Sequence, residues 1–357
     1  MAKNAYLILA NGKVFSGKFF GAEAEVCGEL VFSTAMTGYV EALTDPSYFG
    51  QIVVSTFPSI GNYGVMSEDC ENQCSYLKAY VVREWCQDPS NFRCEGDLDT
   101  FLKQKNVVGL YGIDTRALTK IIRDEGIMNA KIAFSADACD KVLEEIRAYR
   151  ISDAVKAVSA KETVSFTTPI AKKTVAMLDL GTTVSVPKAL ADRDVNVTVY
   201  PADTAADTIL AAKPDGIVIS EGPGAPTDNE AIIAEVKKLL DAGIPMLGLG
   251  LGHQLIALAA GCEVEKMNFG HHGANQPVRY LAENRVIVSS QNHNYAVKAD
   301  SLPAGVHATF VNANDASIEG IAFDAKPVSG VQFRPDAKTA PLNTGFIYDQ
   351  FIATVTK

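Results

Sequence analysis

The segment "GLGLGHQLIALAAG", Gly248 to Gly261, has the pattern of a buried strand, a tight glycine turn and a helix. A strand-to-helix turn of this kind usually presents a catalytic nucleophile at its apex. The apex here is Gly250, which has no side chain. Because glycine adopts such a turn without steric cost, the pattern favours a structural turn. A retained ligand site and hydrolysis by another nucleophile are the alternatives.

Few side chains near this turn could replace a nucleophile or bind a metal. Cys262 comes after the helix, twelve positions beyond Gly250, and at about 1.5 Å per residue it is expected near the far end. His253 is expected to start the helix rather than to catalyse. His271 and His272 stand in a loop-like "FGHHG", and adjacent side chains diverge, so no shared metal is expected. The "CENQC" spacing does not match a zinc site, and we predict no metal.

Strands alternating with helices are predicted to position the turn. From residue 174 onward the expected strands are "TVAMLDL", "VNVTVY", "GIVISEG" and "IPMLGLG", and the expected helices are "VPKALADRD", "TAADTILAAK", "NEAIIAEVKKLLDAG" and "LGHQLIALAAG". This alternation predicts parallel βαβ units, in which sites lie at the carboxyl ends of the strands. Three of those ends, "DLGTT", "SEGPGAP" and "GLGLGHQ", are therefore expected to converge on one crevice.

The first part of the chain has a different pattern of apolar and turn-forming residues. Residues 1–132 contain short β-type runs separated by Gly, Pro, Asn and Asp, with helical patterns such as "TRALTKIIRDEG". In that pattern Leu118, Ile121 and Ile122 share one face, and Gly126 is a plausible stop. Residues 133–173 are rich in Ala, Lys, Ser and Glu and are predicted to connect the two domains, 1–132 and 174–357. The expected class is α/β, with a β-rich amino-terminal domain.

The composition of the chain argues against some classes of binding partner. The chain has 357 residues, a net charge of −10 and seven cysteines. The negative charge argues against nucleic acid, since phosphate binding needs clustered Lys and Arg. No run approaches the roughly 20 apolar residues of a membrane span. The odd, scattered cysteines and the lack of an export signal favour reduced thiols in a cytoplasm.

A family resemblance follows from these motifs. "SEGPGAP" with "GLGLGHQ" is similar to the class I glutamine amidotransferase pattern G-P-G-x-P and G-x-C-x-G-H-Q. "FGHHGANQPV" and "SSQNHNYAV" resemble the versions in carbamoyl phosphate synthetase small subunits. "TAMTGYVEALTDPSYFGQIV", "PSIGNYGV" and "GIDTRALTKIIRDEG" are similar to the amino-terminal domain of that family. The resemblance covers essentially the whole chain and implies an amidotransferase-like α/β domain with a mostly parallel sheet.

The resemblance implies a specific reaction. In that family a Cys at the elbow attacks the glutamine amide, a His moves the proton and a Glu orients the His. Ammonia then passes to a large subunit, which uses ATP and bicarbonate to make carbamoyl phosphate for arginine and pyrimidine biosynthesis. This chain has Gly250 in place of the Cys, and Arg334 and Asp336 in place of the His and Glu. Glycine forms no thioester and arginine stays protonated, so we expect negligible hydrolysis.

The positions implied to contact glutamine are better retained. They are Ser47, Gly222, Gly224, Leu251, Gln254, Asn292, Asn294 and Tyr295. Asn294 stands where the family has Gly and Tyr295 where it usually has Phe, so the pocket is expected to be more crowded. Arg334 is expected to pair with Asp336, or with the carboxylate of a bound amino acid such as glutamine or of another small anion.

The resemblance therefore implies a small subunit with a disabled glutaminase site, which acts as a structural and regulatory partner of an ammonia-dependent large subunit. No cofactor is expected in this chain. The alternative is a non-catalytic sensor protein that binds an amino acid or anion in the old pocket.

Overall fold

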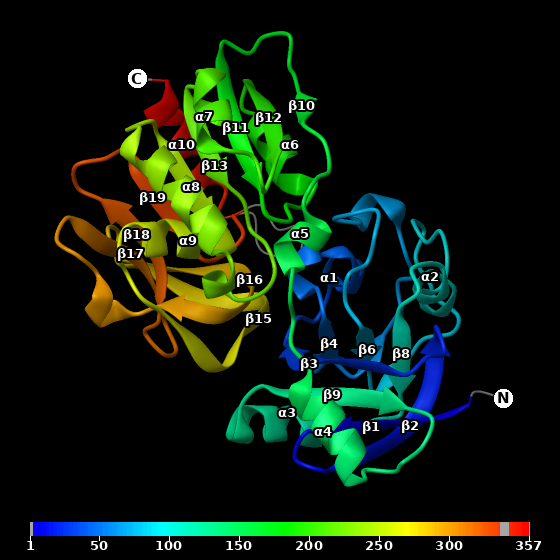
Figure 1. Cartoon of the computed structure of the whole chain (residues 1–357). Coiled ribbons are helices and arrows are strands. Elements are labelled where there is room, and N and C mark those ends of the chain that lie inside the picture. The colour runs from blue at the N-terminus through cyan, green and yellow to red at the C-terminus, as the bar shows by residue number, and fades with distance from the viewer. Residues whose placement is uncertain (1–2, 336–342, 357) are drawn as a thin grey trace. The chain divides into compact units, whose positions relative to one another are not determined.

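The computed structural model describes residues 3–335 and 343–356, and these form two compact units. The first unit comprises residues 1–152 with 268–273, and the second comprises 153–267 with 274–357. Figure 1 shows the elements of both. The segment 133–173 is divided between the two units at Ser152. Its helix α4 (Asp140–Ala148) belongs to the first, and α5 (Ala154–Val158) and β10 (Val164–Phe166) belong to the second.

The first unit is built on a closed barrel. Its strand order is β1 (Asn4–Leu9), β2 (Val14–Gly21), β8 (Val108–Tyr111), β6 (Ala79–Val81), β4 (Gln51–Ser55), β3 (Val26–Ser33) and β9 (Met128–Ala133). A small second sheet pairs β5 (Ser59–Ile60) with β7 (Glu84–Trp85). Apolar side chains such as Leu7, Leu30 and Leu110 fill the barrel core. This β-rich unit agrees with the sequence prediction.

Helices surround the barrel as peripheral elements. They are α1 (Tyr39–Thr44), α2 (Leu98–Gln104), α3 (Thr115–Glu125) and α4, with 3-10 turns at Pro46–Tyr48 and Ser67–Asp69. In α3, Leu118 and Ile122 are buried and Gly126 ends the helix at a φ of 88°. The predicted apolar face and helix stop are both confirmed.

The second unit contains one sheet of ten strands. The order is β10, β12 (Val195–Pro201), β11 (Lys173–Asp179), β13 (Gly216–Ile219), β14 (Met246–Leu249), β19 (Val328–Val331), β18 (Ile318–Phe323), β16 (Arg285–Val297), β15 (Val264–Tyr280) and β17 (Val306–Asn312). The strands from β12 to β19 pair in parallel, as the alternating pattern predicts. The strands β15 to β18 add an antiparallel extension that this pattern does not predict.

Helices cover both faces of the parallel region. Side chains of α6 (Ser185–Ala191) and α10 (Phe346–Val355) pack on one face. Side chains of α7 (Ala206–Ala211), α8 (Glu230–Asp241) and α9 (Leu251–Ala259) pack on the other (Figure 1). Two further 3-10 turns lie at Pro226–Asp228 and Ala299–Ser301. This doubly covered sheet places the ends of β11, β13 and β14 side by side. Among the described residues, no helix combines the length and apolar character needed to cross a bilayer.

Candidate functional site

The glycine turn joins β14 to α9, as the sequence predicts. Gly250 has a φ of 50° and a ψ of −112°, and its N–H donates to the carbonyl of Val331 at 2.9 Å. An added Cβ at this position would lie 3.1 Å from the Cβ of Glu221. Gly252, two residues later, brings α9 so close to β13 that a Cβ there would lie 2.1 Å from the carbonyl oxygen of Ile219. The turn is therefore tightly packed and has no nucleophilic group at its apex.

Arg334 follows β19 and is anchored to the antiparallel extension. Its N–H donates to the carbonyl of Ser290 at 3.0 Å. The residue is 9% exposed, and Nη2 of its guanidinium donates to the hydroxyl of Thr183 at 3.2 Å. Thr183 lies after β11, in the predicted "DLGTT" tip. Asp336, the acid that the sequence suggests as the partner of Arg334, lies outside the described residues.

Glu221 connects the tips of β11 and β13. Its Oε1 accepts hydrogen bonds from the N–H of Thr183 at 3.0 Å and from its hydroxyl at 3.2 Å. It is 3% exposed, while Thr183 is fully buried. Glu221 also packs beside Gly250. It therefore lies next to the elbow, and Thr183 links it to Arg334. The predicted convergence of three strand tips is confirmed.

The sequence did not single out Glu221 as a residue of the site. The only available signal was an acidic residue placed directly after a buried strand, in the first positions of "SEGPGAP". Its partners are distant in the chain, with Thr183 lying 38 positions away. Gly222 and Gly224 of the same loop follow it, before the 3-10 turn at Pro226–Asp228.

The residues implied to bind glutamine fall into two groups. Ser47 lies in the first unit, where its hydroxyl donates to Asp45 at 2.6 Å. The remainder lie in the second unit: Gly222 and Gly224 after β13, Leu251 and Gln254 on α9, and Asn292, Asn294 and Tyr295 on β16. Asn294 is buried and Tyr295 is half-buried.

Gln254 has a structural role in the fold. Its amide nitrogen donates to the carbonyl of Tyr295 at 2.7 Å and to Oε1 of Gln332 at 2.9 Å. The amide group offers two N–H donors, and both have protein acceptors. Gln254 therefore ties α9 to β16 and to the segment after β19, and its donors are not available to a ligand in this arrangement.

His253 lies fully buried in the first turn of α9. Neither ring nitrogen hydrogen-bonds to a described residue. Burial lowers the pKa of His253 to about 3, because the cationic ring would lose its hydration. The ring lies against β19, since a Cβ added at Gly330 would approach Nδ1 to 2.8 Å. A neutral imidazole that packs under the helix start agrees with the predicted non-catalytic role.

Cys262 lies beyond the far end of α9 and is 4% exposed. Burial raises the pKa of its thiol, which disfavours the reactive thiolate. Its position past the end of the helix agrees with the sequence prediction.

The prediction of a loop around His271 and His272 was wrong. Both residues lie in β15 and are buried. The carbonyl of His272 accepts from the N–H of Thr34 at 3.2 Å, and Phe269 stacks on Phe32 at 6.3 Å between ring centroids. These contacts within the first unit hold the segment extended despite its glycines and polar side chains.

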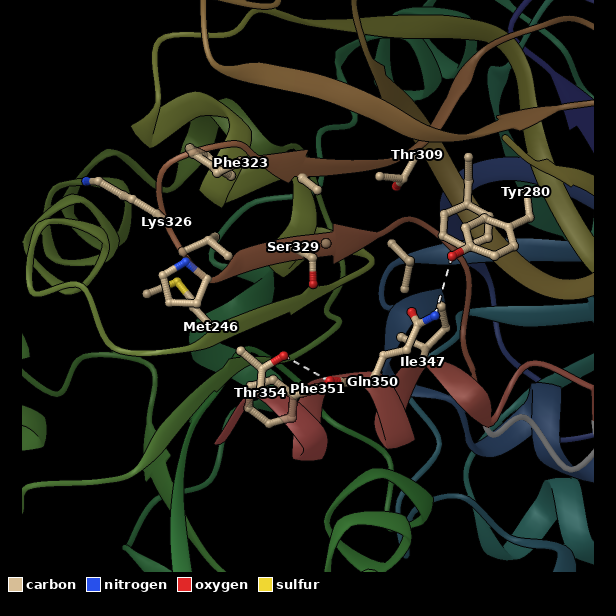
Figure 2. A pocket seen from close by; sticks show the side chains of 16 residues that line it. Met246, Tyr280, Thr309, Phe323, Lys326, Ser329, Ile347, Gln350, Phe351 and Thr354 are labelled. Atoms are coloured by element: carbon tan, nitrogen blue, oxygen red, sulfur yellow. Dashed lines mark hydrogen bonds between the residues drawn. The ribbon is translucent and has the colours of Figure 1, made fainter. Parts of the chain in front are cut away.

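A separate pocket of about 300 Å³ lies beside α10, on the face of the sheet opposite α9. Figure 2 shows Ser329 and the Gln350 side chain at this pocket, with Gln350 Nε2 donating to the Tyr280 hydroxyl at 3.4 Å. The Lys326 ammonium donates to Asp241 at 3.1 Å. None of the residues implied to act on glutamine lines the pocket, so it is distinct from the glycine turn.

Comparison with known families covers both units. A family described as "Carbamoyl-phosphate synthase small chain, CPSase domain" matches residues 7–132. A family described as "Glutamine amidotransferase class-I" matches residues 176–354. The second match includes the glycine turn, Glu221 and Arg334.

Individual relatives match over nearly the whole chain. The carbamoyl phosphate synthase small chain of Clostridium perfringens is 44% identical over 348 residues and covers 98% of each chain. That of Oceanobacillus iheyensis is 43% identical, covering 98% of this chain and 95% of the relative. That of Lactococcus lactis subsp. lactis is 41% identical, covering 97% of this chain and 96% of the relative.

Proposed function

The chain belongs to the carbamoyl phosphate synthase small chain family, and we propose that it is a member that no longer hydrolyses glutamine. In this proposal it serves as the structural and regulatory partner of a large subunit. That subunit binds ATP and takes its nitrogen from free ammonia. Membership of a small chain family supports the existence of a large-subunit partner.

The observation that carries the proposal is the chemistry of the elbow. Amide hydrolysis through a covalent intermediate needs a nucleophile at the apex and a base beside it. Gly250 supplies no nucleophile, and Arg334 is a permanent cation that donates to Thr183 and accepts no proton. Losing the nucleophile or the base alone costs on the order of 10⁶ in turnover in a serine hydrolase. The loss of both supports an inactive site.

Neither of the two candidate groups that the sequence offered near the turn provides a substitute nucleophile. The Cys262 thiol is buried past the end of α9, and its raised pKa keeps it protonated. His253 is fully buried at the start of α9, packed against Gly248 of β14 and Gly330 of β19. Neither lies at the apex where the substrate carbonyl would have to be placed, so both are assigned to packing.

The experiment that tests the proposal compares nitrogen donors. The purified chain is combined with a carbamoyl phosphate synthase large subunit, and carbamoyl phosphate is measured with glutamine or with ammonium chloride. We expect synthesis with ammonium only. A small chain that retains the Cys, His and Glu of the family serves as the positive control, and it should support both donors.

Two results would contradict the proposal. Glutamine-supported synthesis near the ammonium rate would mean that the site is active. Failure to form a complex with any large subunit, together with isolation as a free homo-oligomer, would favour the alternative sensor protein.

A further inference from the structure

The pocket beside α10 arises from small side chains in the middle of the sheet. Ser329 of β19 pairs with Leu247 of β14 on one side and with Ala322 of β18 on the other. Side chains that pair across neighbouring strands point to the same face, and Leu247 belongs to the core that α6 and α10 cover. Ser329 and Ala322 therefore face α10, and both are too short to fill the space beneath it. A hollow of about 300 Å³ remains between them and the helix.

The lining of this pocket is largely apolar and aromatic. Phe310, Val331 and Phe351 line it and are at most 5% exposed. The ring of Tyr280 stacks on that of Phe310, with 4.6 Å between the centroids and 15° between the planes. Aromatic side chains favour a further ring in stacked or edge-on contact. The pocket is also at the lower end of the roughly 300–1,000 Å³ that is usual for small-molecule sites, so a single flat ring suits its size.

Neutral hydrogen-bonding groups stand at the edge of the apolar lining. The Gln350 amide donates to the Tyr280 hydroxyl at 3.4 Å, and the Thr354 hydroxyl donates to the main-chain carbonyl of Gln350 at 3.0 Å. Figure 2 shows the hydroxyl of Ser329 pointing from β19 towards α10. A carboxamide offers donors and an acceptor, and a hydroxyl offers both roles. These groups can orient a ligand that carries an amide or a hydroxyl.

The charge at the pocket is already paired. Lys326 is the one charged side chain among the described residues that line it. Its ammonium donates to the carbonyl of Leu240 at 3.0 Å and to the carboxylate of Asp241 at 3.1 Å. A charged ligand would lose hydration here without gaining an unpaired opposite charge, and that loss opposes its binding. The pocket therefore favours uncharged molecules.

We propose that this pocket is a small-molecule binding site for an uncharged aromatic compound that carries an amide or hydroxyl substituent. The ring lies on the apolar lining, and the substituent hydrogen-bonds to Gln350, Tyr280 or Ser329. The site is distinct from the glycine turn, and the inference does not depend on the proposed loss of glutamine hydrolysis.

Three probes of nearly the same shape test the inference on the purified full-length chain. Benzamide is neutral, benzoate is an anion and benzamidinium is a cation. Ligand-observed NMR measures the broadening of their ring-proton signals as the protein is titrated. Benzamide should bind with a dissociation constant of about 1–10 mM, which is ordinary for a ligand of this size, and both ions should bind at least tenfold more weakly. Absence of benzamide binding, or equal binding of either ion, would overturn the inference.

Variants that fill the hollow test where benzamide binds. Ser329→Leu should abolish the binding, because the larger side chain occupies the space under α10. Ala322→Leu fills the same space from the neighbouring strand, and it replaces the first variant if urea unfolding shows that S329L does not fold. Ser165→Leu is the matched control, since Ser165 is an exposed residue of β10 that does not line the pocket. It should keep the affinity of the natural chain. A folded filling variant with unchanged affinity would contradict the proposed site.

A competition experiment separates this inference from the proposed function. Glutamine should not displace benzamide, because the pocket lies apart from the residues implied to contact glutamine. Displacement would move the probe to that other region and overturn the inference. Failure of benzamide to bind leaves the proposed loss of hydrolysis intact. Glutamine-supported carbamoyl phosphate synthesis would refute the proposed function and leave the pocket assignment unchanged.

Discussion

Replacing Gly250 with alanine should destabilise the second unit by an amount that follows from the geometry of the turn. The added Cβ would sit 3.1 Å from the Cβ of Glu221, closer than the roughly 3.5–4.0 Å of a favourable carbon contact. Backbone strain at a φ of 50° costs about 1–3 kcal/mol, and overpacking costs about 1–3 kcal/mol. Alanine also lowers the conformational entropy of the unfolded chain, and this effect offsets about 0.4–1 kcal/mol of the loss. The expected net loss in the free energy of unfolding is about 3 kcal/mol.

Gly243→Ala is the matched control. Gly243 follows α8 with a φ of 72°, and an added Cβ there would meet no atom within 4 Å. Gly243→Ala should therefore lower the free energy of unfolding by about 1–2 kcal/mol because of the left-handed backbone, with no further loss from crowding. Urea unfolding, monitored by circular dichroism, measures the loss in the free energy of unfolding for each variant. The fluorescence of Trp85, the single tryptophan of the chain, reports the unfolding of the first unit separately. A loss at Gly250 no larger than that at Gly243 would refute the proposed crowding against Glu221.

Three further predictions concern the same region. Gly250→Cys alone should release no glutamate from glutamine, because Arg334 supplies no base, and a thioester-dependent rate above background would contradict that assignment. The triple variant G250C/R334H/D336E is the smallest change that supplies all three catalytic groups, and its glutamate release should exceed that of the single variant. For His253, the pKa of about 6.5 in the unfolded chain exceeds the pKa of about 3 in the folded chain. The unfolded chain therefore binds more protons, and the free energy of unfolding falls as the pH drops from 6.5 towards 3. His253→Leu should remove about 2 kcal/mol of the stability loss between pH 7 and 5, and an unchanged pH slope would argue against a buried neutral ring. Gln254→Ala should lower the free energy of unfolding by about 1–3 kcal/mol, because it removes the hydrogen bond that the buried Gln332 Oε1 accepts, and an unchanged urea midpoint would contradict its structural role.

The parallel half of the second unit could be predicted because each strand is a short apolar run between helical patterns. Ile217, Val218 and Ile219 are all fully buried in β13, and Gly250, directly after β14, marks the turn. Buried parallel strands and their helices carry this signal locally, so one sequence is sufficient to place them. The strand tips then converge as a consequence of the topology.

The antiparallel extension could not be predicted in the same way. Along β15, buried and exposed residues do not alternate regularly, and its buried stretch includes His271 and His272. Polar residues between glycines resemble a loop, and it is pairing with distant segments that holds them extended. The strand β10 is also weak as a local signal, because Val164 is 46% exposed and only pairing with β12 defines it.

Glu221 shows the corresponding limit for the site. Loss of the nucleophile and base could be recognised from residue types alone, since glycine and arginine cannot perform those roles. The hydrogen bond between Arg334 and Thr183 could not, because the two residues are separated by 151 positions and no pattern in one sequence pairs them. The sequence expectation of Asp336 as the partner remains a prediction.

The most direct test of the central claim is the release of glutamate from glutamine by the purified chain in complex with a large subunit. The measurement uses saturating glutamine, with a complex containing an intact small chain as the positive control. A rate equal to that of the buffer is predicted, because no thiol stands at Gly250 and no base at Arg334. Sustained glutamate release that depends on enzyme concentration would contradict the account.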